Sequence, residues 1–291
     1  MIWLLLLLVT GAVGLAAYWL PLRIVRPVRR LIVLDPGDLG YPFESSTLTT
    51  ADGLLLAATY VPATVPARGN LVILHGKDSA RELYLEYLPQ LLPFGYNVLL
   101  YDARAHGRSQ GRYTTFGYHE WEDVLLAVRH LRHLAPGLPT GVFGHSMGGA
   151  VALQALARSS EIDFGVVESA FTHLGEIINA YASRQAGFAL PRGFTDVVLD
   201  RAGQVAGFEP RTVEPVRAAV SVRQPVLVIH GEEDGSIDVD HGRRLYAALG
   251  SEWKELYVVR GAGHDDIVEI GGDDYYRRLR AFLNEATEAN P

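Results

Sequence analysis

The chain has 291 residues, 48% of them apolar and 20% charged, so a large folded core is expected and disorder is excluded. It contains no cysteine, which excludes disulfides, thiolate metal sites and cysteine nucleophiles. The first thirty residues carry four arginines and no acid, whereas the remainder carries 22 basic against 33 acidic residues. The net negative charge of this larger part of the chain repels the phosphate backbone of a nucleic acid, so no nucleic-acid partner is expected.

The N-terminal segment differs from everything that follows it. Ile2 to Leu22 contain no charged side chain, and a helix of that length rises about 31 Å, which matches the hydrocarbon thickness of a bilayer. Arginines follow this run directly and none precedes it, so the positive-inside rule predicts a single-pass anchor over 2–22 with the rest of the chain in the cytoplasm. A basic, proline-containing linker over 23–42 then leads to one domain over 43–291.

A cleaved secretory signal is the alternative interpretation of this segment. The small residues Gly14-Leu15-Ala16 would form its cleavage site, and the domain would then be secreted. A signal peptide begins with a basic stretch, however, and here the apolar run starts without one. We therefore expect the segment to be retained and the domain to be attached to a membrane.

After the linker, short apolar runs alternate with helical stretches. An Asp-Gly turn between Thr47–Thr50 and Leu54–Val61 predicts a hairpin. The apolar runs that follow are Leu71–Leu74, Asn97–Tyr101, Gly141–Phe143, Val166–Val167, Val226–Ile229 and Leu256–Val259. The helical stretches are Arg81–Leu92, Tyr118–His133, Ala150–Arg158, Val239–Leu249 and Asp274–Ala289. This alternation predicts an α/β fold with a mostly parallel central sheet and helices on both faces.

The most informative motif is Gly144-His145-Ser146-Met147-Gly148, which follows a predicted strand and precedes a helix of small residues. A serine on such a turn adopts a strained backbone that exposes its hydroxyl, and glycines at positions 144 and 148 avoid collisions with the strand and the helix. We interpret Ser146 as a nucleophile. A serine that only caps the helix after a glycine turn is the alternative.

A nucleophilic serine needs a base, and the base needs an acid that orients it. His264 lies in a glycine-rich loop after the last apolar run, and Asp234 follows the run at Val226–Ile229. Ligands collect at the carboxyl ends of parallel strands, so both side chains are expected at the edge where Ser146 lies. The order of serine, acid and histidine is also that of enzymes with this turn. Glu233 and Asp238 remain alternatives for the acid.

Negative charge that develops on a substrate oxygen needs fixed N–H donors. The backbone amide of Met147 is one candidate, and the amide of Lys77, in the loop after Leu71–Leu74, is the other, with Asp78 as its alternative. The Lys77 ammonium is a further candidate for contact with an anionic substrate. The chain has neither a phosphate-binding loop nor a dinucleotide fingerprint, so no cofactor and no metal ion are expected.

These residues resemble the α/β-hydrolase superfamily over most of the chain, from about Leu48 to Leu283. The pattern is most similar to the BEM46-like and ABHD12/ABHD13/ABHD17-like serine hydrolases, many of which carry an N-terminal membrane segment. The matching stretches are Thr50–Gly53, Leu74–Gly76, Tyr101–Ser109, the Ser146 motif, Glu168–Phe171, Pro225–Asp234 and Gly263–His264. Ala105 departs from the pattern because glycine is usual there, and Lys77 departs because small or amide side chains are usual.

The resemblance implies an α/β-hydrolase fold, a catalytic triad of Ser146, Asp234 and His264, and an oxyanion hole formed by the amides of Lys77 and Met147. It also implies a small cap over the site, for which 171–223 is the expected segment. Apolar residues at helical spacing near the start of this segment, such as Leu174, Ile177, Ile178 and Tyr181, indicate either core packing or an acyl-chain pocket.

The sequence therefore predicts a membrane-anchored serine hydrolase that cleaves a carboxylic ester or thioester, small or lipid, through an acyl-serine intermediate. Two alternatives remain. One is an amide-cleaving serine hydrolase, and the other is a non-catalytic binding or scaffold protein that retains the hydrolase fold.

Overall fold

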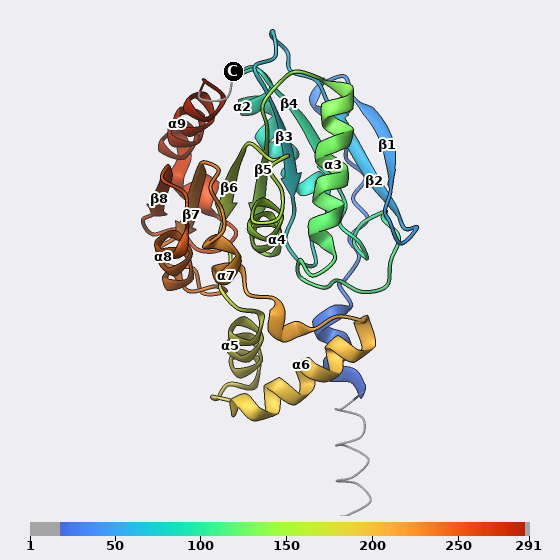
Figure 1. The fold of residues 1–291 in the computed structure, drawn as a ribbon, viewed down its shortest axis with the longest axis vertical. Helices are drawn as coiled ribbons and strands as arrows, with labels where there is room; N and C mark the ends of the chain where they lie inside the picture. The colour runs from blue at the N-terminus through green and yellow to red at the C-terminus, as the bar shows by residue number, and fades with distance from the viewer. Residues whose placement is uncertain (1–17, 289–291) are drawn as a thin grey trace, which may run out of the picture.

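The computed structural model describes residues 18–288, which form one eight-stranded sheet with helices on both of its faces (Figure 1). The strands are β1 (Glu44–Thr49), β2 (Leu55–Val61), β3 (Gly69–Leu74), β4 (Tyr96–Tyr101), β5 (Thr140–His145), β6 (Phe164–Glu168), β7 (Val226–Gly231) and β8 (Lys254–Val259). Their order in the sheet is β1-β2-β4-β3-β5-β6-β7-β8. β1, β2 and β4 pair antiparallel and all other pairs are parallel, which confirms the predicted hairpin and the mostly parallel sheet.

The helical elements are η1 (Pro36–Leu39), η2 (Arg81–Tyr87), α2 (Leu88–Leu91), α3 (Glu120–Leu134), α4 (Met147–Leu156), α5 (Leu174–Ala186), α6 (Arg192–Ala206), η3 (Pro210–Thr212), α7 (Pro215–Ala219), α8 (Val239–Ala248) and α9 (Ile267–Glu288). One core lies between the sheet and α3, α4, α7 and α8, and a second lies between the sheet and η2, α2 and α9. Alternate residues of β3 serve the two cores, with Val72 and Leu74 in the first and Leu71 and Ile73 in the second.

Two of the predicted helical stretches differ in detail from the structure. The stretch Arg81–Leu92 is helical as predicted, but it forms a 3₁₀ helix and then a single α-helical turn. Pro89 lies in that turn and has no amide N–H to donate to a carbonyl four residues earlier, which prevents a continuous α-helix. The last helix was expected from Asp274 but begins at Ile267 and breaks its direction at Gly272, where φ is 49°.

The predicted anchor over 2–22 lies mostly outside the described residues. Residues 18–25 are helical, and within 18–288 the structure contains no helix whose length and apolar content would suffice to cross a bilayer. The stretch expected as a linker, 23–42, runs along the domain, and its buried Val25 is part of the first core.

The segment expected as a cap, 171–223, consists of two parts. Helices α5 and α6 pack on each other and project from the domain at the end where residues 18–25 also lie (Figure 1). Asn179 of α5 donates to the hydroxyl of Thr195 in α6 at 2.9 Å and so ties the pair together. Helix α7, by contrast, packs against α4 and α8 and belongs to the layer that covers the sheet.

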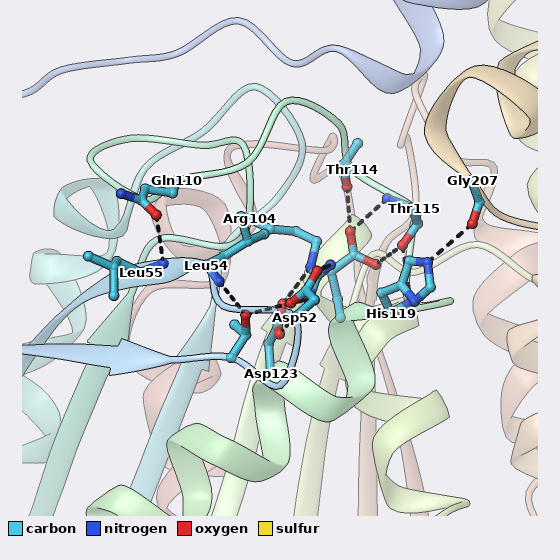
Figure 2. Close-up of polar contacts among 12 residues, drawn as sticks. Asp52, Leu54, Leu55, Arg104, Gln110, Thr114, Thr115, His119, Asp123 and Gly207 are labelled. Carbon is cyan, nitrogen blue, oxygen red and sulfur yellow. Dashed lines mark hydrogen bonds and ion pairs between the residues drawn. The ribbon is translucent and has the colours of Figure 1, made fainter.

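The loop after β4 is held by a group of charged side chains (Figure 2). The guanidinium of Arg104, which is almost fully buried, donates to both carboxylate oxygens of Asp123 in α3, at 2.7 and 2.8 Å, and to Asp52 in the β1–β2 turn at 3.1 Å. This arrangement fixes the hairpin turn, the loop and α3 relative to one another. The next residue, Ala105, has a φ of 66°, which explains why glycine is usual at this position.

Candidate active site

Ser146 occupies a strained turn between β5 and α4. Its φ of 56° and ψ of −118° lie in a region that residues with a side chain rarely adopt. The amide of Ser146 donates to the carbonyl of Glu168 at 2.8 Å, which holds the turn against the end of β6. The side chain is left partly exposed at the carboxyl end of the sheet.

The two glycines of the motif are required by close backbone contacts. A Cβ atom on Gly144 would lie 2.3 Å from the carbonyl oxygen of Gly148, and one on Gly148 would lie 2.2 Å from the carbonyl oxygen of Leu74. Side chains at either position would therefore collide with main-chain atoms that cannot move without displacing β3 or the turn. The spacing Gly-x-Ser-x-Gly is a consequence of packing β3, β5 and α4 this closely.

The structure brings Ser146, His264 and Asp234 into one hydrogen-bonded chain. Nε2 of His264 lies 3.0 Å from the hydroxyl oxygen of Ser146, and Nδ1 of His264 lies 2.6 Å from Oδ2 of Asp234. The other oxygen of Asp234 accepts from the amides of Ser236 and Ile237, at 2.8 and 2.7 Å. The backbone thus fixes one oxygen of the carboxylate, and the other oxygen faces the imidazole of His264.

The contact between Asp234 and His264 shifts both groups toward their charged forms. Burial by itself would raise the pKa of Asp234, but hydrogen bonds from His230 and His264 hold this pKa well below its ordinary value. Burial by itself would lower the pKa of His264, but the hydrogen bond and the charge of Asp234 raise it above 6.5. Asp234 is therefore an anion at neutral pH and favours uptake of a proton by His264.

The alternative acids do not take this place. Asp238 caps α8, where its side chain accepts from the amide of Asp240 at 2.8 Å. Glu233 is exposed to solvent in the loop after β7. Among the described residues, Asp234 is the acid that contacts the ring of His264.

The loop after β3, with Gly76, Lys77 and Asp78, runs beside the serine. A Cβ built on Gly76 would lie 3.3 Å from the Cβ of Ser146, so the backbone of this loop passes within contact distance of the nucleophile candidate. The amide of Lys77 makes no hydrogen bond within 18–288, and the amide of Met147 is in the first turn of α4, where an N–H has no acceptor in its own helix. The Lys77 ammonium is paired with the carboxylate of Asp78 at 2.8 Å.

Two side chains that support the site were not identified from the sequence. One is His230, whose Nε2 donates to the carbonyl of Ile237 at 2.8 Å and lies 3.4 Å from Oδ2 of Asp234. Tyr84 of η2 accepts from the amide of Gly76 at 3.2 Å, and its oxygen lies 3.0 Å from Nδ1 of His145. The sequence contains a signal for the role of His230, because this histidine precedes Asp234 by four residues at the end of a strand. It contains no comparable signal for Tyr84, which lies inside an apolar helical stretch.

One group of possible metal ligands occurs among the described residues, namely His145, His264 and Asp265, whose ligand atoms lie within 4.8 Å of one another. Both ring nitrogens of His264 are engaged, by Ser146 and by Asp234. Those of His145 are engaged as well, by Tyr84 and by the carbonyl of His264. The imidazole nitrogens of this group therefore already have hydrogen-bond partners.

Comparison with known proteins identifies the family. Residues 65–188 match the family described as serine aminopeptidase, S33. The chain is 32% identical to the uncharacterized protein YqkD of Bacillus subtilis, over 75% of this chain and 73% of the relative. It superposes on the esterase Pf2001 of Pyrococcus furiosus with a TM-score of 0.76 and 28% identity, covering 90% of this chain and 97% of the esterase. This chain belongs to the α/β-hydrolase superfamily.

Other relatives of this α/β-hydrolase include the human monoglyceride lipase, which is 27% identical over 75% of this chain and 82% of the lipase. The stretch that matches the family, 65–188, contains the loop after β3 and the Ser146 turn. Asp234 and His264 come after that stretch.

Proposed function

We propose that this α/β-hydrolase is a membrane-anchored serine hydrolase that cleaves a carboxylic ester or thioester through an acyl-serine intermediate. The observation that carries the proposal is the hydrogen-bonded chain of Ser146, His264 and Asp234, with distances of 3.0 and 2.6 Å. The likeness to an esterase and to a lipase supports an ester as the bond that is cleaved.

In the first half of the reaction, the hydroxyl oxygen of Ser146 attacks the carbonyl carbon of the substrate while Nε2 of His264 accepts the hydroxyl proton. The amides of Met147 and Lys77 donate hydrogen bonds to the oxyanion that forms. Asp234 accepts from Nδ1–H of His264 and stabilises the imidazolium. The tetrahedral intermediate then collapses, the bond to the leaving group breaks, and His264 returns the proton to the departing alcohol or thiol.

In the second half, water takes the place of the leaving group. Nε2 of His264 accepts a proton from the water as its oxygen attacks the acyl carbon, and the same two amides stabilise the second oxyanion. Collapse of this intermediate breaks the bond to Ser146, which recovers its proton from His264. The carboxylic acid leaves, and the enzyme returns to its starting state without a cofactor.

The membrane part of the proposal rests on the sequence of the N-terminus. We infer that 2–22 is a retained single-pass segment, and that the arginines after it keep the domain on the cytoplasmic side. Washing membranes with carbonate tests this directly. The full-length chain should stay in the membrane pellet, and a shortened chain in the soluble fraction would indicate a cleaved signal instead.

A lipid ester is the substrate class that the cap favours. The hairpin of α5 and α6 exposes large apolar side chains, with Phe188 and Val197 64% and 68% exposed and Tyr181 and Phe194 about half exposed. Over 174–206 the hairpin has three arginines and three acids and so carries no net charge, although the chain as a whole is acidic. An apolar surface without net charge on an acidic protein is suited to contact with a bilayer, from which a lipid ester would reach the site.

Activity measurements on the full-length chain in detergent test the proposal. A Ser146→Ala variant should lose all hydrolysis of p-nitrophenyl and acyl-thioester substrates. The control is Ser221→Ala, which changes an exposed serine after α7 and should keep full activity. Hydrolysis that survives in Ser146→Ala would contradict the proposal, and a folded wild-type chain without activity toward any member of the panel would favour the scaffold alternative.

An amide is the second candidate, because the family that 65–188 matches is described as a serine aminopeptidase. The same attack and proton transfer apply, with an amine as the leaving group. Aminoacyl p-nitroanilides added to the ester and thioester panel separate the candidates. A kcat/KM that is highest for an anilide would replace the ester proposal.

A further inference from the structure

The stretch directly after the apolar N-terminal segment makes specific contacts with the loops beside the serine. We propose that this stretch, residues 25–29, which we call the strap, positions the oxyanion loop, residues 75–78. The inference rests on the proposed function, since it assigns the strap a role in presenting the Lys77 amide. In this proposal the strap contributes to the geometry of the site and does not only link the domain to a membrane.

The strap contacts the oxyanion loop directly. The amide of Val28 donates to Oδ1 of Asp78 at 2.7 Å, and the other oxygen of Asp78 pairs with the ammonium of Lys77 at 2.8 Å. Asp78 has a φ of 58°, a conformation that costs an ordinary residue energy and persists only where surrounding contacts hold it. The hydrogen bond from Val28 is such a contact, one residue away from the proposed oxyanion donor.

Arg29 fixes the strap to the neighbouring loop. Its guanidinium donates to four main-chain carbonyls, those of His106, Gly107, Ser109 and Gly111. Five N–H groups in a planar fork can satisfy a ring of carbonyls in a way that a single ammonium cannot. The charge of Arg29 is thus used to hold the strap in place, next to the position from which Val28 reaches Asp78.

The loop that Arg29 contacts is itself joined to the oxyanion loop. The amide of Ala103 donates to Nε2 of His75 at 2.9 Å, and Nδ1 of His75 donates to the carbonyl of Gly76 at 2.7 Å. The rings of His75 and His106 lie edge to face, with their centres 4.9 Å apart. The oxyanion loop is therefore supported through His75 from one side and by the strap, through Asp78, from the other.

The strap is also attached near the second oxyanion donor. Val25 is fully buried in the first core, and its carbonyl accepts from the amide of Thr114 at 2.8 Å. The hydroxyl oxygen of Thr114 lies 3.4 Å from the sulfur of Met147, the residue after the serine. The strap thus contacts the oxyanion loop directly through Val28 and is linked to Met147, at the start of α4, through Thr114.

Two variants of the full-length chain test the inference, and both change an arginine in the same segment. Arg29→Ala removes all four contacts to the carbonyls. Arg30→Ala is the matched control, because within 18–288 the side chain of Arg30 makes neither a hydrogen bond nor an ion pair. Both variants lower the positive charge by one, so any general effect of charge is the same for the two.

The first readout is hydrolysis of a short, soluble ester. Loss of a complete oxyanion donor costs about 10²- to 10³-fold in kcat, so a displaced donor should cost about tenfold. Arg29→Ala should therefore lower kcat about tenfold with little change in KM, and Asp78→Ala should do the same. The double variant should be no worse than either single one, because both act on the same loop. Equal kcat values for Arg29→Ala, Arg30→Ala and wild type would overturn the inference.

The second readout does not depend on hydrolysis. Amide hydrogen exchange in peptides that cover 75–80 should be faster in Arg29→Ala than in wild type, and unchanged in Arg30→Ala, at a temperature where all three chains are folded. If no ester is ever hydrolysed but exchange at 75–80 rises in Arg29→Ala alone, the proposed function fails and the strap contact stands. Unchanged exchange there would overturn the inference. If Arg29→Ala fails to fold, Arg29→Lys replaces it in the experiment, because lysine keeps the charge but lacks the planar guanidinium. The same increase in amide hydrogen exchange at 75–80 is expected for Arg29→Lys.

Discussion

The loops at the carboxyl ends of the strands and the hairpin of α5 and α6 are held in different ways. Around Ser146, glycines lie at positions where a methyl group would collide with main-chain atoms. Each side-chain nitrogen of His264 and each carboxylate oxygen of Asp234 has a hydrogen-bond partner. In the hairpin, by contrast, Gly187 and Gly193 have no atom within 4 Å of the position a Cβ would take, and large apolar side chains face solvent. The chemistry is thus built into tightly packed backbone, whereas the surface that would meet a substrate or a bilayer is lightly constrained.

The largest expected effect of breaking the packed region is on catalysis. Asp234→Asn keeps the shape of the side chain but removes the charge that orients and stabilises the imidazole, so kcat should fall about 10⁴-fold. Steady-state hydrolysis of a short ester measures it. A loss below tenfold would contradict the assignment and give the role of the acid to another residue. Glu233→Gln is the control in the same loop and should retain activity, since this side chain is exposed.

The second effect is on stability and compares a glycine from each region. Gly148→Ala places a methyl group 2.2 Å from the carbonyl oxygen of Leu74 and should lower the free energy of unfolding by about 3 kcal/mol. Gly193→Ala, near the start of α6, meets no atom and should raise this free energy by about 0.5 kcal/mol, because alanine favours a helix. Chemical denaturation of the two variants measures both values. A tolerated Gly148→Ala would show that the turn can relax and is not held as tightly as the distances imply.

The third prediction concerns pH. Hydrolysis requires the neutral imidazole of His264, whose pKa Asp234 raises above 6.5, so kcat/KM should fall as the pH drops through a midpoint above 6.5. In Asp234→Asn the charge that raises this pKa is gone, and the midpoint of the residual activity should move to lower pH. The profile of kcat/KM against pH for both chains is the measurement. A midpoint that is the same in the two chains would mean that another group controls the profile.

The smallest effect on the chemistry is expected in the hairpin of α5 and α6. Since the chain has no cysteine, Phe188→Cys carries one thiol-reactive environment-sensitive probe, and Val65→Cys, exposed in the β2–β3 connection at the opposite end, is its control. With the full-length chain in phosphatidylglycerol vesicles, the emission at 188 should shift to the blue and be quenched from the lipid phase, while that at 65 should not. Equal emission at the two positions would mean that the hairpin does not contact the bilayer.

Activity of the same hairpin variant sharpens the comparison. Phe188→Ser should hydrolyse a short soluble ester at a rate within about twofold of wild type, because replacing an exposed side chain has little effect on stability. Its rate on a lipid ester held in vesicles should fall by more than that. Equal losses on the soluble and the lipid ester would place the effect of Phe188 at the site itself.

The same contrast explains what the sequence could predict. Strands β3 to β7 are short runs that are buried on both faces, whereas β8 is buried only in part, and all six were predicted to within a few residues. The Ser146 turn was found because its geometry demands glycines at 144 and 148. Asp234 and His264 were selected from their places after β7 and β8, and the structure brings their side chains into hydrogen-bond contact. Where the backbone is constrained locally, the amino-acid sequence contains a local pattern from which the structure can be predicted.

Contacts between residues far apart in the chain leave no such local pattern. Helix α6 was not predicted, because its exposed apolar residues Phe194 and Val197 obscure the polar face of an ordinary surface helix. The support of Asp234 by His230 and of Gly76 by Tyr84 depends on packing between separate elements. The hydrogen bonds of Arg29 to a loop some eighty residues later were likewise hidden, and its charge was interpreted only as part of a basic flank.

The central claim is that Ser146 is activated by His264 and becomes acylated. Treatment of the full-length chain with a fluorophosphonate probe, followed by digestion and tandem mass spectrometry, tests it most directly. We predict a single adduct, on the hydroxyl of Ser146, that is absent in Ser146→Ala and strongly reduced in His264→Ala. An adduct on another residue, or labelling that persists unchanged in Ser146→Ala, would contradict the account.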